Sequence, residues 1–378
     1  MLFQKDVDTL VHLVADEWER TKLVLGKQSS VKPEIFSVFS KLSEWHLDGP
    51  QSLSEVYETC VSLGRFDASL AWVVGVSNSA WSMLGNFPAQ TIEQFGHPIV
   101  SMVLGRPGVV TFDDKKNTAT INGEWKYCSG YEQSGGFVGL VKDDRPGGDV
   151  YVALMPSTEL AVVNFWKAIG LKGTGSHTVK AESLVLDKDT LIPYSAILEG
   201  SICDNHATSY RNLFTGVLMN CLTGSIVGAT LHLLDIAIDR VSKNPIGGSS
   251  YVCGKDSGTI RSTIGGLVSK VQEIYEFGKG GAKFVDGVAN GNRELWSSKN
   301  RALLRVRASR VMNQCREVAD ELVWIMGSSV MVEGDPAAEI WKDIHVGALH
   351  GGFSKFIPEE AAGIALFGDD PFNLTKML

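Results

Sequence analysis

The spacing of hydrophobic residues changes twice along the chain, and this change constrains the fold more than any other feature. Residues 1–104 predict helices, because apolar residues recur every three or four positions, as they do in Val7–Leu25, Ser52–Gly64 and Ser69–Leu84. Residues 105–205 carry short β-type runs that are separated by turn residues. Helical spacing returns in residues 206–378, most clearly in the stripe through Leu304–Val323. We therefore predict an α+β chain with an N-terminal helical segment, a central β-barrel or sandwich and a C-terminal helical bundle.

Short runs rich in β-branched and aromatic residues define the central segment. Asn122-Gly123 predicts a hairpin turn between two of these runs, and RPGGD at 145–149 predicts another turn. The runs are VVTF (109–112), TATI (118–121), FVGLV (137–141), VYVALM (150–155), LAVVNF (160–165) and ESLVL (182–186).

The stretch Leu213–Leu234 contains no Asp, Glu, Lys or Arg and is long enough to span a bilayer. Asn220 and His232 interrupt it, however, and an amphipathic helical pattern follows directly. A helix that is buried on nearly all sides explains this pattern better than a membrane span. We expect its glycines to allow close approach of another helix or a ligand: Gly216, Gly224 and Gly228.

Composition excludes several classes of function. The net charge of the 378 residues is −8, and Lys and Arg are scattered, which argues against nucleic acid as a partner. The six cysteines form no C-x-x-C pair and no metal-ligand spacing, so we expect reduced thiols, a cytoplasmic location and no metal site. The N-terminal residues also lack the apolar stretch of a signal peptide.

Four motifs give the chain a resemblance to a known fold family. They are RFDASLAW (65–72), GEWKYCSG (123–130), GLKGTGS (170–176) and IWKD (340–343) followed by His350. Together they resemble the acyl-CoA dehydrogenase fold, and more narrowly the flavin-dependent monooxygenases built on it, which are oxygenase components of two-component systems. The resemblance covers about residues 50–365. It implies an N-terminal helical domain (1–104), a central β-domain (105–205) and a C-terminal four-helix bundle (206–378).

The resemblance also implies a cofactor and a reaction. A separate NAD(P)H-dependent flavin reductase supplies FMNH2 or FADH2, O2 adds at C4a of the flavin, and the hydroperoxide transfers an oxygen atom to the substrate. No G-x-G-x-x-G follows a strand in the chain, which agrees with the absence of a nicotinamide site of its own. The implied product is a hydroxylated or epoxidised small aromatic, of the indole or phenol type. A homotetramer is expected by the same resemblance.

Particular residues acquire roles from this resemblance. His350 and Ser129 are the expected catalytic residues, His350 by exchanging a proton with substrate or peroxide and Ser129 at the flavin N5. The expected substrate contacts are Trp81, Phe353 and His350. The expected cofactor contacts are Ser129, Gly130, Thr174, Gly175, Ser176 and, for a phosphate, Arg211.

Each of these residues also has a purely structural interpretation. Ser129-Gly130 and GTGS are compatible with ordinary turns, and His350 with a helix cap or a hydrogen-bonded core histidine. His177 and His345 are further histidine candidates. Asp343 is expected to brace helix packing, and the arginines of the long C-terminal stripe are assigned to helix surface or subunit contacts: Arg301, Arg305 and Arg307.

The dehydrogenase reaction of the same fold is disfavoured. Many of its members place a glutamate eight residues after the aspartate of the fourth motif, where this chain has Gly351. Lys342 also replaces the arginine that precedes that aspartate, so a bidentate contact is lost. The alternatives that stay open are N- or S-oxygenation of an amino-sugar or a thiophene, an acyl-CoA dehydrogenase of a different branch, and a non-catalytic homologue.

Overall fold

The computed structural model describes residues 52–94, 99–199 and 213–378, so the predicted helix Val7–Leu25 lies outside the described residues. Within the described part, contacts divide the chain into two compact units. The sheet unit contains Trp72–Lys167 and Lys172–Leu218. The helical unit contains Leu53–Ala71, Ala168–Leu171 and Met219–Leu378. The division into domains at residues 104 and 205 stays a prediction.

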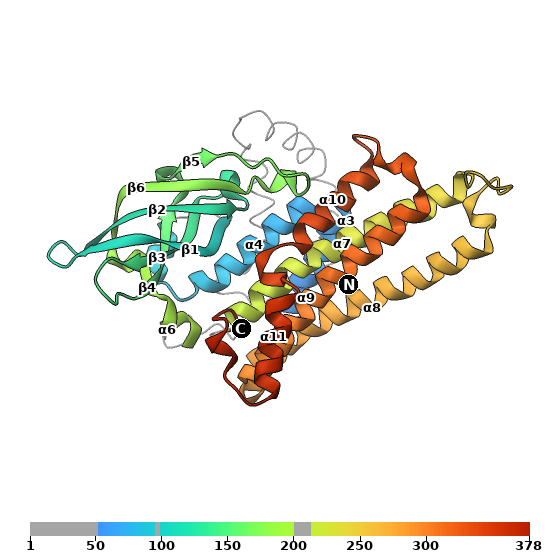
Figure 1. The fold of residues 1–378 in the computed structure, drawn as a ribbon. Coiled ribbons are helices and arrows are strands. Elements are labelled where there is room, and N and C mark those ends of the chain that lie inside the picture. The colour runs from blue at the N-terminus through green and yellow to red at the C-terminus, as the bar shows by residue number, and fades with distance from the viewer. Residues whose placement is uncertain (1–51, 95–98, 200–212) are drawn as a thin grey trace. The chain divides into compact units, whose positions relative to one another are not determined.

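The described helices fall in the two segments that the apolar spacing predicts to be helical, except α6, which lies in the predicted β segment (Figure 1). The first described helix begins and ends within two residues of the expected segment 52–64, and the segment 69–84 is helical throughout. The described helices are α3 (Leu53–Phe66), α4 (Ala68–Leu84), α5 (Ala89–Glu93), α6 (Tyr194–Glu199), α7 (Phe214–Lys243), α8 (Gly258–Ala289), α9 (Ser298–Met326), α10 (Pro336–Ala348) and α11 (Phe356–Leu366).

The sheet unit is built on one mixed sheet of seven strands in the order β5-β6-β2-β1-β3-β4-β7. β1 and β3 are parallel, and the other neighbouring pairs are antiparallel. Five of the six predicted β-type runs lie wholly in these strands, and the run 160–165 extends one residue beyond β5 at each end. β1 begins five residues before the expected boundary at 105. The strands are β1 (Val100–Asp113), β2 (Thr118–Cys128), β3 (Gly136–Asp143), β4 (Val150–Pro156), β5 (Ala161–Asn164), β6 (His177–Asp187) and β7 (Leu191–Pro193).

The turn predicted at Asn122-Gly123 is wrong, because both residues lie inside β2. The connection between β1 and β2 is instead the charged stretch 114–117, which precedes Asn122 in the sequence. There the Asp113 carboxylate accepts hydrogen bonds from the backbone N–H groups of Lys115 and Lys116, and Asn117 has a φ of 55°. Aspartate and asparagine favour such turns by bonding nearby backbone, and this local chemistry overrides the Asn-Gly signal. The turn predicted at 145–149 is confirmed.

The uncharged stretch forms α7, whose most apolar window is 72% buried inside the protein. In the helical unit α7 crosses α3 with backbone against backbone. A Cβ added to Gly228 would lie 2.1 Å from the carbonyl oxygen of Val61, and one added to Gly64 would lie 2.3 Å from that of Ser225. Only glycine leaves room for this crossing, so the expected close approach of another helix is confirmed for Gly228.

Long helices build the rest of the helical unit. α8 and α9 run side by side, and α10 and α11 also pack along α9 (Figure 1). Asp286 on α8 caps the start of α3: its carboxylate accepts the backbone N–H groups of Leu53 at 2.7 Å and Ser54 at 3.1 Å. Asp286 therefore satisfies helix-terminal donors that would otherwise be buried without partners.

The helix crossing gives a test with a matched control. We predict that Gly228→Ala lowers the free energy of unfolding by about 2 kcal/mol or more, because the new methyl group overlaps the backbone of α3. Gly265→Ala, on α8 where an added Cβ meets nothing within 4 Å, should instead raise stability by about 0.5–1 kcal/mol. Urea denaturation of both variants checks this, and equal effects at the two positions would contradict it.

Candidate functional site

Three hydroxyl groups form a buried chain in the sheet unit. The Oγ of Ser129 lies 2.8 Å from the Oγ of Ser176, which lies 2.7 Å from the Oγ1 of Thr174. The backbone N–H of Gly130 donates to the carbonyl oxygen of Thr174 at 2.8 Å. All three hydroxyl-bearing residues are buried. The structure therefore brings together residues of two separate motifs that the sequence assigned to one cofactor.

A bulge at the end of β2 aims Ser129 at this chain. The pairing of β2 with β6 shifts register between Trp125 and Cys128, and Tyr127 within the bulge has a φ of 68°. Such a φ is rare for an aromatic residue and marks a locally strained backbone. Gly130 follows with a φ of 73°, and a Cβ there would lie 2.8 Å from the side chain of Val73 on α4.

Aromatic side chains stand beside the hydroxyl chain. Tyr127 is 65% exposed, and its ring meets that of Trp166 edge to face at 6.0 Å. Phe165, 43% exposed, meets the His177 ring at 5.2 Å. Exposed rings next to buried hydroxyls suit a flat ligand with a polar edge, which is the chemistry of an isoalloxazine. Tyr127 was not a sequence candidate, although it lies in the second motif, GEWKYCSG.

His177 is a structural residue. Its Nδ1 accepts the backbone N–H of Trp166 at 2.9 Å, which leaves Nε2 to donate to the Glu132 carboxylate, also at 2.9 Å. Glu132 was not a sequence candidate, and its second oxygen is buried without a hydrogen-bond partner among the described residues. The same holds for both side-chain polar atoms of the neighbouring Gln133. The hydrogen bond between His177 and Glu132 fixes the start of β6, directly after Ser176.

His350 lies in the helical unit, on the turn that follows α10. Its Nδ1 accepts the backbone N–H of Gly352 at 3.2 Å, which leaves Nε2 as the hydrogen-bond donor. The side chain keeps contact with solvent, yet the protein around it desolvates the ring and lowers the pKa of His350 to about 4. The ring of Phe353 is fully buried and lies 5.5 Å from it. Contact of Phe353 with a substrate stays a prediction.

The remaining histidine and aspartate of the fourth motif have packing roles. Asp343 accepts the backbone N–H of Leu171 at 2.5 Å, so it fixes the segment before Lys172, as expected for a bracing residue. His345 bonds the carbonyl oxygen of Trp341 and lies 3.1 Å from the Asp320 carboxylate. Lys342 pairs with Glu339 on its own helix at 2.6 Å.

Two tryptophans and one arginine complete the residues considered for the site. Trp81 is a nearly buried residue of α4 in the sheet unit, and its role toward a substrate stays a prediction. Trp125 belongs to the core of the sheet, where its indole N–H donates to the carbonyl oxygen of Leu140. Arg211 lies outside the described residues. No cluster of three or more His, Cys, Asp or Glu side chains that could hold a metal occurs among the residues the structure describes.

Comparison of the sequence with known proteins finds flavin-dependent oxygenases. No family model matches the chain. The oxygenase subunit HsaA of a flavin-dependent monooxygenase from Mycobacterium tuberculosis is 25% identical over 265 residues, which is 67% of this chain and 64% of HsaA. The chain thus spans slightly less than two thirds of that relative. Indole-3-acetate monooxygenase of Acinetobacter baumannii is 23% identical over 97% of this chain and 90% of its own length.

Solved structures agree over almost the whole chain. XiaF from a Streptomyces species, determined with FADH2 and glycerol, superposes with a TM-score of 0.88 at 18% identity, covering 98% of this chain and 96% of XiaF. TdsC from Paenibacillus, determined with FMN and indole, gives 0.76 at 16% identity, covering 95% and 96%. The chain therefore has the acyl-CoA dehydrogenase-like fold of these flavin monooxygenases, which confirms the fold and the resemblance predicted from its four motifs.

Proposed function

We propose that this protein is the oxygenase component of a two-component, reduced-flavin-dependent monooxygenase that hydroxylates or epoxidises a small aromatic substrate. The observation that carries the proposal is the buried hydroxyl chain of Ser129, Ser176 and Thr174, together with the exposed ring of Tyr127, two residues before Ser129, which meets the half-buried ring of Trp166. The names of the relatives support it, since HsaA and indole-3-acetate monooxygenase are both oxygenases.

The residues of the sheet unit fit a reduced flavin. FMNH2 or FADH2, when bound, supplies the reaction with O2 that no side chain can perform. Ser129 offers a hydroxyl that can donate to or accept from a ring nitrogen, and Ser176 and Thr174 keep that hydroxyl oriented. Gly130 and Gly175 turn the backbone beside it with positive φ values of 73° and 51°, and Tyr127 gives a ring for stacking.

His350 is proposed to act as a hydrogen-bond donor rather than as a base. Its Nδ1 is engaged by Gly352, and its low pKa keeps the ring uncharged at neutral pH. The Nε2–H is then the group that can bond a substrate oxygen or nitrogen, or donate toward the oxygen that is transferred. The resemblance implied that His350 exchanges a proton with substrate or peroxide. The hydrogen bond at Nδ1 restricts this role to donation from Nε2.

Acyl-CoA dehydrogenation is a weaker alternative. The turn that follows α10 reads His350-Gly351-Gly352-Phe353, so it offers no carboxylate to remove an α-proton. S-oxygenation has one observation in its favour, the structural likeness to TdsC, whose structures describe it as a dibenzothiophene monooxygenase. We therefore include a thiophene among the substrates to be tested.

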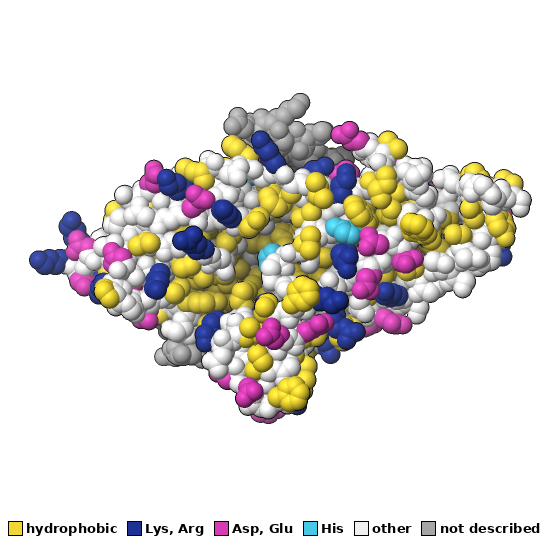
Figure 2. All heavy atoms as spheres, viewed as in Figure 1, with side chains coloured by type: hydrophobic (Ala, Val, Ile, Leu, Met, Phe, Trp, Pro, Cys, Tyr) yellow, Lys and Arg dark blue, Asp and Glu magenta, His cyan; other side chains and the backbone are white. Residues whose placement is uncertain are grey.

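The partners are proposed on similar grounds. A separate NAD(P)H-dependent reductase would supply the reduced flavin, because HsaA is described as an oxygenase subunit. A homotetramer would cover the large apolar side chains that the helical unit exposes, among them Trp324, Leu349, Phe356 and Phe367. Figure 2 shows hydrophobic side chains among charged groups on one face of the protein. A cytoplasmic location agrees with cysteines that form no disulfide in the described part of the chain.

Oxygen incorporation tests the function. The purified protein is loaded anaerobically with FMNH2 or FADH2, and ¹⁸O2 is added with indole, a phenol, a thiophene or an amino-sugar. We expect one ¹⁸O atom in the product from an aromatic substrate, detected by mass spectrometry. Neither flavin binding nor labelled product with any substrate would refute the proposal, and flavin bleaching by an acyl-CoA without O2 would favour the dehydrogenase.

The hydroxyl chain gives a second prediction. Ser176→Ala removes the partner of Ser129, so we expect about tenfold weaker binding of reduced flavin, in line with the loss of one buried hydrogen bond. Anaerobic titration followed by flavin fluorescence measures this. Ser249→Ala, in an exposed loop of the helical unit, is the matched control and should bind as the wild type does. Equal affinity of the two variants would contradict the assignment.

The His350 ring gives a third prediction. NMR titration of the histidine rings, with His350→Gln identifying the signals, should show a midpoint near pH 4 and the proton on Nε2. Because the pKa in the folded chain lies below that of a free histidine, acidification below about pH 6.5 should progressively favour unfolding through this group. A proton on Nδ1 of the neutral ring would contradict the donor role, and a midpoint near 6.5 would contradict the lowered pKa.

A further inference from the structure

The turn that carries His350 is tied to α9 by two side chains of the helical unit. The Nε of Arg305 donates to the carbonyl oxygen of Gly352 at 3.4 Å. One turn further along α9, the hydroxyl of Ser309 lies 2.9 Å from the carbonyl oxygen of Phe353 and 3.2 Å from that of Ser354. The turn His350–Ser354 therefore rests on polar contacts as well as on the packing of Phe353.

Arg305 is an unusual residue for this place. It was assigned to a helix surface or a subunit contact, but it is only 5% exposed, so that assignment is wrong for Arg305. Among the described residues no carboxylate pairs with its guanidinium, which bonds a hydroxyl and backbone carbonyls instead. A buried cation without a counter-ion is costly, and desolvation lowers the pKa of Arg305. Packing alone would be served better by an apolar side chain, so the hydrogen bonds are the reason for the guanidinium.

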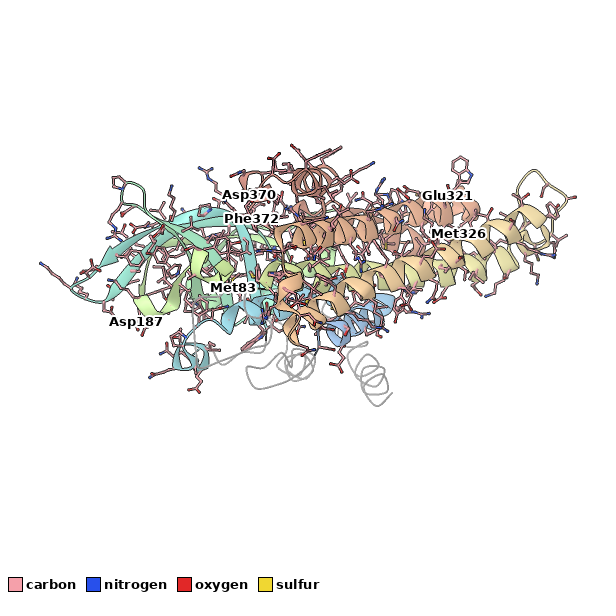
Figure 3. The ribbon with its side chains drawn as sticks, turned by 90° about the horizontal axis from the view of Figure 1, so that it is seen from below. Met83, Asp187, Glu321, Met326, Asp370 and Phe372 are labelled. Atoms are coloured by element: carbon pink, nitrogen blue, oxygen red, sulfur yellow. The ribbon has the colours of Figure 1, made fainter. Side chains whose placement is uncertain are left out.

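The same guanidinium also holds the C-terminal segment. Its Nη1 donates to the hydroxyl of Thr375 at 3.0 Å and to the carbonyl oxygen of Met377 at 2.9 Å. Figure 3 shows Phe372 of this segment at the end of α9 that lies away from Met326. One side chain thus bridges the His350 turn and a segment more than twenty residues further along the chain.

Gly352 links Arg305 to the imidazole of His350. Its backbone N–H donates to the Nδ1 of His350, and its carbonyl oxygen accepts from Arg305. We propose that Arg305 is a positioning residue that orients His350 through Gly352 and couples this orientation to the docking of residues 371–377. The proposal rests on the role of His350 given under Proposed function.

The neighbouring arginines of α9 supply matched controls. Arg301 donates to the carbonyl oxygen of Leu378 and lies over the Phe372 ring at 4.8 Å. Of the two segments that Arg305 bridges, Arg301 thus contacts the C-terminal one and not the His350 turn. Arg307 lies over the Phe277 ring of α8 at 4.6 Å and bonds neither segment. Arg301→Met and Arg307→Met therefore separate the loss of any α9 arginine from the loss of the bridge.

Hydrogen–deuterium exchange on the flavin-free protein tests the bridge directly. Arg305→Met replaces the aliphatic stem with an unbranched apolar chain and removes the guanidinium donors, and we expect the Gly352 and Phe353 amides to exchange about tenfold faster or more. Arg305→Lys, with a single ammonium, should restore part of the protection. Arg301→Met should affect only the segment 371–378, and Arg307→Met neither segment. Unchanged exchange at residues 350–354 in Arg305→Met would overturn the proposal.

Turnover then tests the link to His350. With reduced flavin, O2 and substrate, Arg305→Met should bind flavin as the wild type does but form several-fold less product per flavin oxidised, with more hydrogen peroxide, as His350→Ala should. Faster exchange with unchanged product yield would overturn the link. If the wild-type protein itself gives no product, the proposed function fails, while the exchange result still decides whether Arg305 holds the turn.

A second variant protects the test against misfolding. Thr375→Val removes one of the two C-terminal acceptors without leaving a buried charge beside a cavity. If Arg305→Met gives no cooperative unfolding transition, Thr375→Val and Arg305→Lys should show smaller increases in exchange at both segments together. Faster exchange at 371–378 alone would contradict the coupling.

Discussion

The buried hydrogen bond between Ser129 and Ser176 joins the end of β2 to the start of β6, and the candidate flavin contacts depend on it. Two hydroxyl groups inside a sheet core are tolerated only when each has a partner, so this bond restricts how the two strand ends can lie. The bulge at Tyr127 then becomes a requirement, because a regular β2 would point Ser129 to the other face. The strained backbone at Tyr127 therefore fixes the position of the Ser129 hydroxyl.

His350 is held in a different way, by backbone rather than by side-chain hydroxyls. Gly352 uses its N–H for the imidazole and its carbonyl for Arg305, so the protonated ring nitrogen is set by a peptide unit. A backbone donor has no alternative rotamer and no titration of its own, which makes the choice between the ring nitrogens robust to pH. Orientation of a histidine by a neighbouring donor is a general device in catalytic and metal sites.

The sequence predicted the helices and strands well, because their hydrophobic periodicity reflects burial on one face or on all faces. The resemblance also singled out Ser129, Ser176 and Thr174, which the structure brings together from two motifs, while their role toward a flavin and that of His350 stay predictions. Residues whose importance depends on tertiary contacts were not found. Arg305 looks like any helix-surface arginine until the fold covers it, and the bulge at Tyr127 leaves no periodic signal. Asn122-Gly123 failed because a local turn signal cannot reveal that a strand continues past it.

The crossing of α3 and α7 joins parts of the chain that leave the ribosome far apart in time. All the described strands lie between these two helices in the sequence, so the face of α3 that carries Gly64 cannot meet α7 until the intervening sheet segment has been made. Closing so long a loop is entropically slow, whereas α8 and α9 are sequence neighbours and can pair early. During synthesis the first described helix is therefore an exposed apolar segment, and the yield of folded protein in cells should depend on how well that segment is protected from aggregation.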